Sequence, residues 1–117
     1  MATLVLCDLP LRDHAWEDCR NGLGIARLLV HERRPEAFVE TACRNAVENA
    51  CRASMAQAGL SFEGDVNRVL EALGAPVDIR MPRGPLPGVT RLEAAERVVG
   101  WLATYLKGED PGRCWGY

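Results

Sequence analysis

Residues 35–59 form a continuous stretch in which small apolar residues recur every three or four positions. Pro35 and Gly59 frame the stretch, and these residue types favour the first turn and the end of a helix. We expect a helix over 35–58, roughly 36 Å long at 1.5 Å per residue. A row of alanines lets a second helix approach closely, so this helix is expected to be central. Its core seam is Ala42, Ala46, Ala50 and Ala53, flanked by Val39, Cys43, Val47, Cys51 and Met55.

Helical periodicity also marks the segments on both sides. Residues 11–31 predict a helix that contains Gly22 and Gly24, which either admit a close neighbour or mark a kink. Residues 62–73 predict a short helix closed by Gly74. The apolar stripes expected in the first and last helices are Trp16, Cys19, Leu23, Ala26 and Val30, and Leu92, Ala95, Val99, Leu102 and Leu106.

The last helix is expected to open at Thr90, because Thr90 and Glu93 have the spacing of a capping box. Residues 75–89 hold four prolines and two glycines, which exclude regular helix and favour an extended loop. The sequence therefore predicts an all-α fold, an up-and-down four-helix bundle with a proline-rich loop before the last helix.

Length and composition favour one domain over residues 1–117, with a helical core at about 11–107 and a flexible tail at 108–117. No apolar run approaches the ~20 residues that cross a membrane, so no membrane association is expected. The five cysteines are scattered and form no Cys-x-x-Cys pair, which predicts reduced thiols and a cytoplasmic location and argues against a structural zinc site. The sequence also lacks a Gly-x-x-x-x-Gly-Lys phosphate loop and a His-Glu-x-x-His motif, so no metal site and no cofactor are expected.

The polar face of the 35–58 helix is the candidate ligand-binding site. Its donors suit a phosphate or the edge of a base, and two loop arginines are placed to reach over it. The alternative is that Glu48 forms ion pairs with its helix neighbours on a solvated face, and that the loop is disordered. The candidate residues are Arg44, Asn45, Asn49 and Arg52 on the helix, and Arg80 and Arg83 in the loop.

The alanine-rich segment 37–59 resembles the long second helix of the HEPN family (higher eukaryotes and prokaryotes nucleotide-binding helical domains). The continuation at 64–74, Gly-Asp-Val-Asn-Arg-Val-Leu-Glu-Ala-Leu-Gly, is similar to the short third helix of that family. The resemblance covers roughly residues 11–107. It implies a helical bundle that forms homodimers. It also implies either a metal-independent ribonuclease, often a toxin of a toxin–antitoxin pair, or a non-catalytic partner of a small nucleotidyltransferase.

The nuclease members carry an arginine followed after four to six residues by a histidine near the last helices. Here the only histidines are His14 and His31, both in the first helical region. The absent motif argues against an enzyme and for a non-catalytic protein that binds a nucleotide or RNA, or docks on a nucleotidyltransferase. The alternatives are a divergent ribonuclease that uses Arg80 or Arg83, and a purely structural dimerisation bundle.

Overall fold

The computed structural model describes residues 9–109, which contain helices and no strand. The helices are α1 (Leu9–His31), α2 (Glu36–Gln57), α3 (Val66–Ala72) and α4 (Gly88–Glu109). The predicted all-α class is confirmed for this part of the chain. The tail expected at 108–117 lies almost wholly outside the described residues. None of the described helices is long and apolar enough to cross a membrane.

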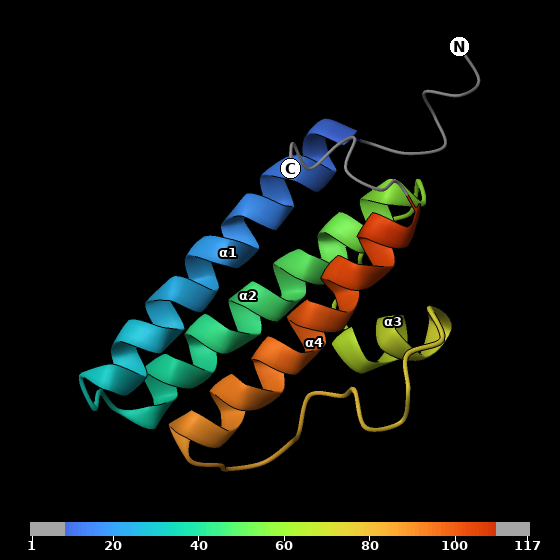
Figure 1. The fold of residues 1–117 in the computed structure, drawn as a ribbon. Coiled ribbons are helices and arrows are strands. Elements are labelled where there is room, and N and C mark those ends of the chain that lie inside the picture. The colour runs from blue at the N-terminus through green and yellow to red at the C-terminus, as the bar shows by residue number, and fades with distance from the viewer. Residues whose placement is uncertain (1–8, 110–117) are drawn as a thin grey trace.

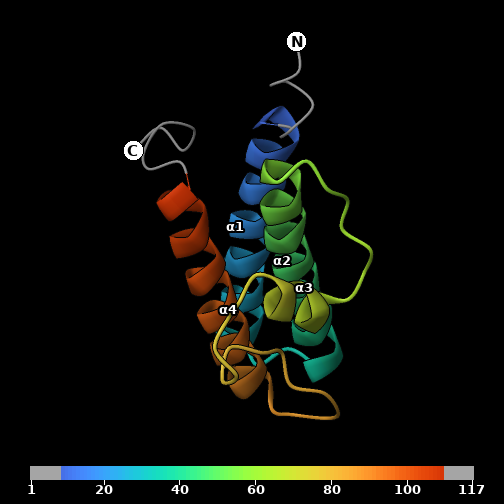
Figure 2. The same ribbon diagram turned by 90° about the vertical axis from the view of Figure 1, so that its right-hand side faces the viewer.

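Three long helices lie side by side, and α2 packs against both of the others (Figure 1). α1 runs in the direction opposite to α2, whereas α4 runs in the same direction as α2. The chain returns between α2 and α4 through residues 58–87, which include the short α3. Figure 2 shows α3 in front of α2, on the side away from α1. This return segment forms one wall of the site described below.

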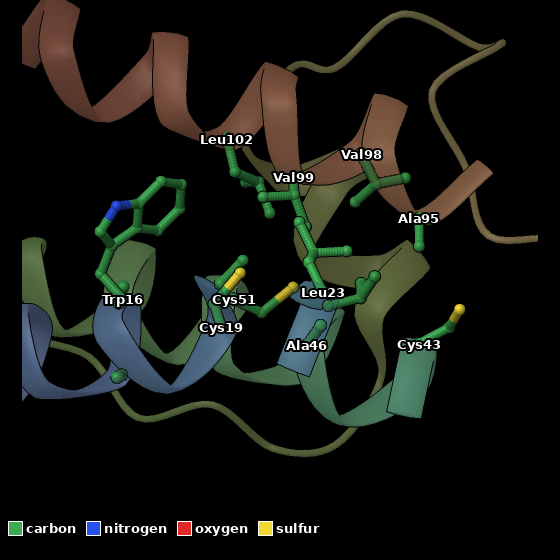
Figure 3. Packing of buried hydrophobic residues seen from close by; sticks show 14 of the residues in the cluster. Trp16, Cys19, Leu23, Cys43, Ala46, Cys51, Ala95, Val98, Val99 and Leu102 are labelled. Atoms are coloured by element: carbon green, nitrogen blue, oxygen red, sulfur yellow. The ribbon is translucent and has the colours of Figure 1, made fainter. Parts of the chain in front are cut away.

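The core lies between α1, α2 and α4, and every residue of the predicted α2 seam is buried. Figure 3 shows Trp16, Leu23 and Leu102 among the side chains that meet there. The predicted α4 stripe is entirely buried, and in the α1 stripe only Val30 is partly exposed. Gly22 lies against α2: a Cβ atom added at this glycine would be 3.1 Å from the Cβ of Ala46. The close approach expected from the alanine row is therefore present.

Three buried cysteines, Cys19, Cys43 and Cys51, belong to this core and carry free thiols. Burial raises the pKa of Cys19 and of Cys51 from the usual 9.0 to about 12. The pKa of Cys43 rises to about 11, also because of burial. A thiol with so high a pKa stays protonated near neutral pH, where it is a poor nucleophile and metal ligand.

Two helices begin at residues other than those expected. α3 starts at Val66 instead of Phe62, because Asp65 caps it by accepting a hydrogen bond from the Arg68 amide at 3.2 Å. α4 starts at Gly88, two residues before Thr90, and the Arg91 amide donates to the Pro87 carbonyl at 3.1 Å. Thr90 therefore lies inside the first turn of α4, where it cannot act as the N-cap of a capping box.

Candidate functional site

A groove of about 350 Å³ lies where α2, the start of α3, the loop at 81–83 and the first turns of α4 come together. Its lining combines apolar side chains with guanidinium and carboxylate groups from segments far apart in the sequence. The apolar part is Val47, Val66, Met81 and Pro82. The polar and charged part is Glu40, Arg44, Glu48, Asp65, Asn67, Arg83 and Arg91.

Arg44 and Arg83 are the two predicted site residues that the structure brings to this groove. Arg44 comes from the exposed edge of α2, and Arg83 comes from the loop. Neither side chain forms an ion pair or hydrogen bond with another residue in the part of the chain described. Because the planar guanidinium donates parallel hydrogen bonds, it binds phosphate and carboxylate groups well. Two such groups at one groove form a candidate anion-binding site.

The loop that carries Arg83 is fastened on both sides of this residue. On one side, the Asn67 amide accepts a hydrogen bond from the Met81 amide at 2.9 Å and donates to the Met81 carbonyl at 3.1 Å. On the other side, Arg91 Nη2 donates to the Gly84 carbonyl at 2.7 Å. Pro82 and Arg83 thus lie between two anchors, one on α3 and one on α4.

Arg91 differs from the other two groove arginines because it is buried and paired. Only 7% of the residue is exposed, and its Nη2 lies 3.5 Å from Glu40 Oε2. The two groups link α4 to α2 across the end of the groove. A buried guanidinium with both a carboxylate and a carbonyl partner is expected to support the groove wall, since removal of either partner leaves a charge unsatisfied.

The carboxylates of the groove also have partners. Glu40 pairs with Arg91, Asp65 caps α3, and Glu48 Oε1 lies 3.9 Å from Arg52 Nη2. The groove therefore holds three carboxylates and three guanidinium groups, so its formal charge is balanced. This balance does not favour a long polyanion, whose binding depends on many cationic contacts. Arg44 and Arg83 are the two of these guanidinium groups that have no described ionic partner, and such a pair can accommodate one localised anionic group.

Arg52 and Asn49 lie outside the groove and bind each other. Arg52 Nη1 donates to Asn49 Oδ1 at 2.9 Å, and the Arg52 guanidinium lies 5.4 Å from the centre of the Phe62 ring. With its contact to Glu48, this arginine has three neighbours on or beside α2. The expected alternative of an ion pair on the helix face thus describes Arg52, whereas Arg44 makes no such pair with Glu48.

The other two candidates, Asn45 and Arg80, are also placed apart from the groove. Asn45 borders a separate hollow of about 290 Å³ between α1 and α2. Arg80 Nη1 donates to the carbonyls of Pro76 at 2.8 Å and Ile79 at 2.7 Å. It also lies 3.3 Å from the Ala75 carbonyl. Arg80 therefore fastens the turn after α3 through its Nη1, which is directed at backbone carbonyls.

Neither His14 nor His31 lies at this groove. His14 and His31 are both exposed on α1, which contributes no lining residue. His14 Nε2 lies 3.5 Å from Asp18 Oδ2, one turn along the same helix. Among residues 9–109, no three histidine, cysteine or acidic side chains are grouped so that they could hold a metal ion.

Sequence reasoning missed Asn67 and Arg91, whose contributions depend on tertiary contacts. Arg91 lies between Thr90 and Glu93 of the expected capping box, where the sequence gives it no separate role. Asn67 follows Asp65 by two positions, and nothing else in the local sequence marks it as functional. Comparisons of the chain with protein-family models, with curated proteins and with solved structures find no match. The resemblance to HEPN proteins therefore stays a prediction.

Proposed function

We propose that this protein is a small cytosolic helical domain of HEPN-like type that binds a nucleotide, or the end of an RNA, without changing it chemically. In this proposal the fold is an up-and-down four-helix bundle in which α3 and its loop take the place of the third long helix. A homodimer, or a complex with a small nucleotidyltransferase, would be the working form.

One observation carries the proposal: Arg44 and Arg83 reach one groove from different segments, and neither has a described ionic partner. A phosphate between them would accept hydrogen bonds from both guanidinium groups. The apolar lining, which includes Val47 and Met81, offers contact area for the ring of a base. The volume of about 350 Å³ lies near the lower end of small-molecule sites, which span ~300–1,000 Å³. One nucleotide unit suits this size.

Balanced charge favours a single terminal phosphate over an extended nucleic acid. Arg44 and Arg83 are exposed, so salt is expected to weaken the contact. The divergent ribonuclease would use Arg80 or Arg83. Arg80 Nη1 donates to loop carbonyls, and no histidine lines the groove beside Arg83 as a candidate base. Binding without catalysis is therefore the function that the geometry supports best.

Calorimetric titration with adenosine 5′-monophosphate, and with adenosine as the control, tests this proposal. We expect the monophosphate to bind and adenosine to bind at least tenfold more weakly. Arg44→Ala and Arg83→Ala should each weaken binding about tenfold or more, because a hydrogen bond to a charged group contributes about 1.5–3 kcal/mol. Arg20→Ala removes the same charge from α1, outside the groove, and should change nothing. Equal binding of both compounds, or an equal loss in Arg20→Ala, would contradict the proposal.

A second candidate function, dimerisation, is favoured by an apolar surface between α1 and α2. Ile25 and Phe38 are 54% and 57% exposed, and with Leu29 they border the hollow that Asn45 also lines. Exposed apolar side chains around a hollow form a surface that a second copy of the chain could cover in a twofold contact. Sedimentation measurements should show a dimer that Phe38→Asp converts to a monomer. Val77→Asp, at an 88% exposed loop position, is the matched control and should leave the dimer intact.

A further inference from the structure

The loop segment between Met81 and Gly84 is short, and hydrogen bonds hold it at each end. Asn67 forms hydrogen bonds with the backbone of Met81 through both its amide oxygen and its amide nitrogen. Arg91 donates to the Gly84 carbonyl and is itself held by Glu40. Only Pro82 and Arg83 lie between these anchors, and the proline ring fixes one further backbone dihedral. The backbone of Arg83 has little freedom left in this arrangement.

We propose that Asn67 and Arg91 are positioning residues that hold Arg83 at the groove before a ligand arrives. Fixing the backbone of a single residue costs about 1–2 kcal/mol in conformational entropy. When the protein fold has already fixed that backbone, ligand binding does not bear this cost. Asn67 and Arg91 thus strengthen binding by pre-organisation, through Arg83 and without a contact to the phosphate. This inference rests on the proposed function, since it assigns Arg83 the same ligand.

The hydrogen bonds of Asn67 favour positioning over direct recognition, because each polar atom of its amide has a backbone partner. Its oxygen accepts from the Met81 amide and its nitrogen donates to the Met81 carbonyl, so both amide atoms are already engaged. A direct ligand contact by Asn67 would act independently of Arg83. A positioning role makes the effects of the two residues dependent on each other, which a double-mutant cycle measures.

The test combines this cycle with backbone dynamics. Asn67→Ala should weaken binding of adenosine 5′-monophosphate about tenfold, or 1.4 kcal/mol. In the Arg83→Ala background, the same substitution should weaken it less than twofold. Asn21→Ala is the matched control, because Asn21 is exposed on α1 outside the groove, and it should have no effect in either background. Tenfold losses in both backgrounds, or no loss in either, would overturn the positioning role.

Amide NMR relaxation of the unliganded protein provides the independent readout. The order parameters of Arg83 and Gly84 should be near 0.85 in the parent protein and fall below ~0.6 in Asn67→Ala, with those of α2 unchanged. Unchanged values at Arg83 and Gly84 would refute the inference, whatever the binding data show. Absence of nucleotide binding by the parent protein would refute the proposed function instead, so the two failures are distinguishable.

Discussion

A methyl group added at Gly22 would meet α2, whereas the same group added at Gly24 would meet nothing. The Cβ built at Gly22 lies 3.1 Å from Ala46 Cβ and 3.3 Å from Ala46 Cα. Carbon atoms attract best at about 3.5–4.0 Å, so the helices would have to move apart by several tenths of an ångström. The Cβ built at Gly24 has no atom within 4 Å.

The two substitutions therefore share one energetic effect and differ in another. Alanine stabilises either helix position by up to about 1 kcal/mol relative to glycine. Overpacking of a close contact costs about 1–3 kcal/mol, and only Gly22→Ala incurs it. Because the helix propensity cancels in the comparison, Gly22→Ala should be less stable than Gly24→Ala by about 1–3 kcal/mol.

Urea unfolding followed by circular dichroism measures this difference. Equal slopes against urea concentration would show that both variants expose the same surface, so that the midpoints compare directly. In thermal unfolding, 1 kcal/mol corresponds to about 4–8 °C for a domain near 100 residues, so Gly22→Ala should melt at least about 4 °C below Gly24→Ala. If Gly22→Ala gained as much stability as Gly24→Ala, the close packing of α1 on α2 at Ala46 would be refuted.

Further predictions concern the core and the cap of α3. The pKa values of Cys19, Cys43 and Cys51 are raised in the folded state, so their contribution to stability is fully present below pH 9 and is lost progressively as the pH rises from 9 to about 11–12. Between pH 8 and pH 10 each thiol should reduce the free energy of unfolding by about 1 kcal/mol. The measured decline should be smaller in Cys51→Ala, and an equal decline would contradict the burial argument. Leu102→Ala, at a fully buried position, should cost about 2–5 kcal/mol in urea unfolding, and a cost below 1 kcal/mol would place this side chain outside the core. Asp65→Ala should cost about 0.5–2 kcal/mol, whereas Asp78→Ala in the following loop should change stability little; equal costs would argue against the cap.

The sequence predicted the helices and their buried faces because both follow from local periodicity. The alanine seam of α2 and the stripe of α4 repeat at helical spacing, and burial acts on that repeat. Contacts between helices could not be predicted from the sequence in the same way. Gly22 and Gly24 look alike in the sequence, and only the position of Ala46 makes one of them a contact. The starts of α3 and α4 differ from the expected ones, because Asp65 caps α3 four residues into the 62–73 segment and Thr90 lies inside the first turn of α4.

The residues of the candidate site could also be predicted only in part. Helix position and loop length point to Arg44 and Arg83 as members of one site, and both residues line the same groove. Whether they bind a ligand stays a prediction. Arg80 and Arg52 could not be separated from them by sequence, because their engagement with loop carbonyls and with Phe62 depends on the fold.

The central claim is that Arg44 and Arg83 together receive one phosphate. The most direct measurement is a proton–nitrogen NMR titration that follows the arginine Nε–Hε signals while adenosine 5′-monophosphate is added. We expect the signals of Arg44 and Arg83 to shift with a common saturation curve, while that of Arg20 stays in place. Absence of shifts at Arg44 and Arg83, or equal shifts at every exposed arginine, would contradict the account.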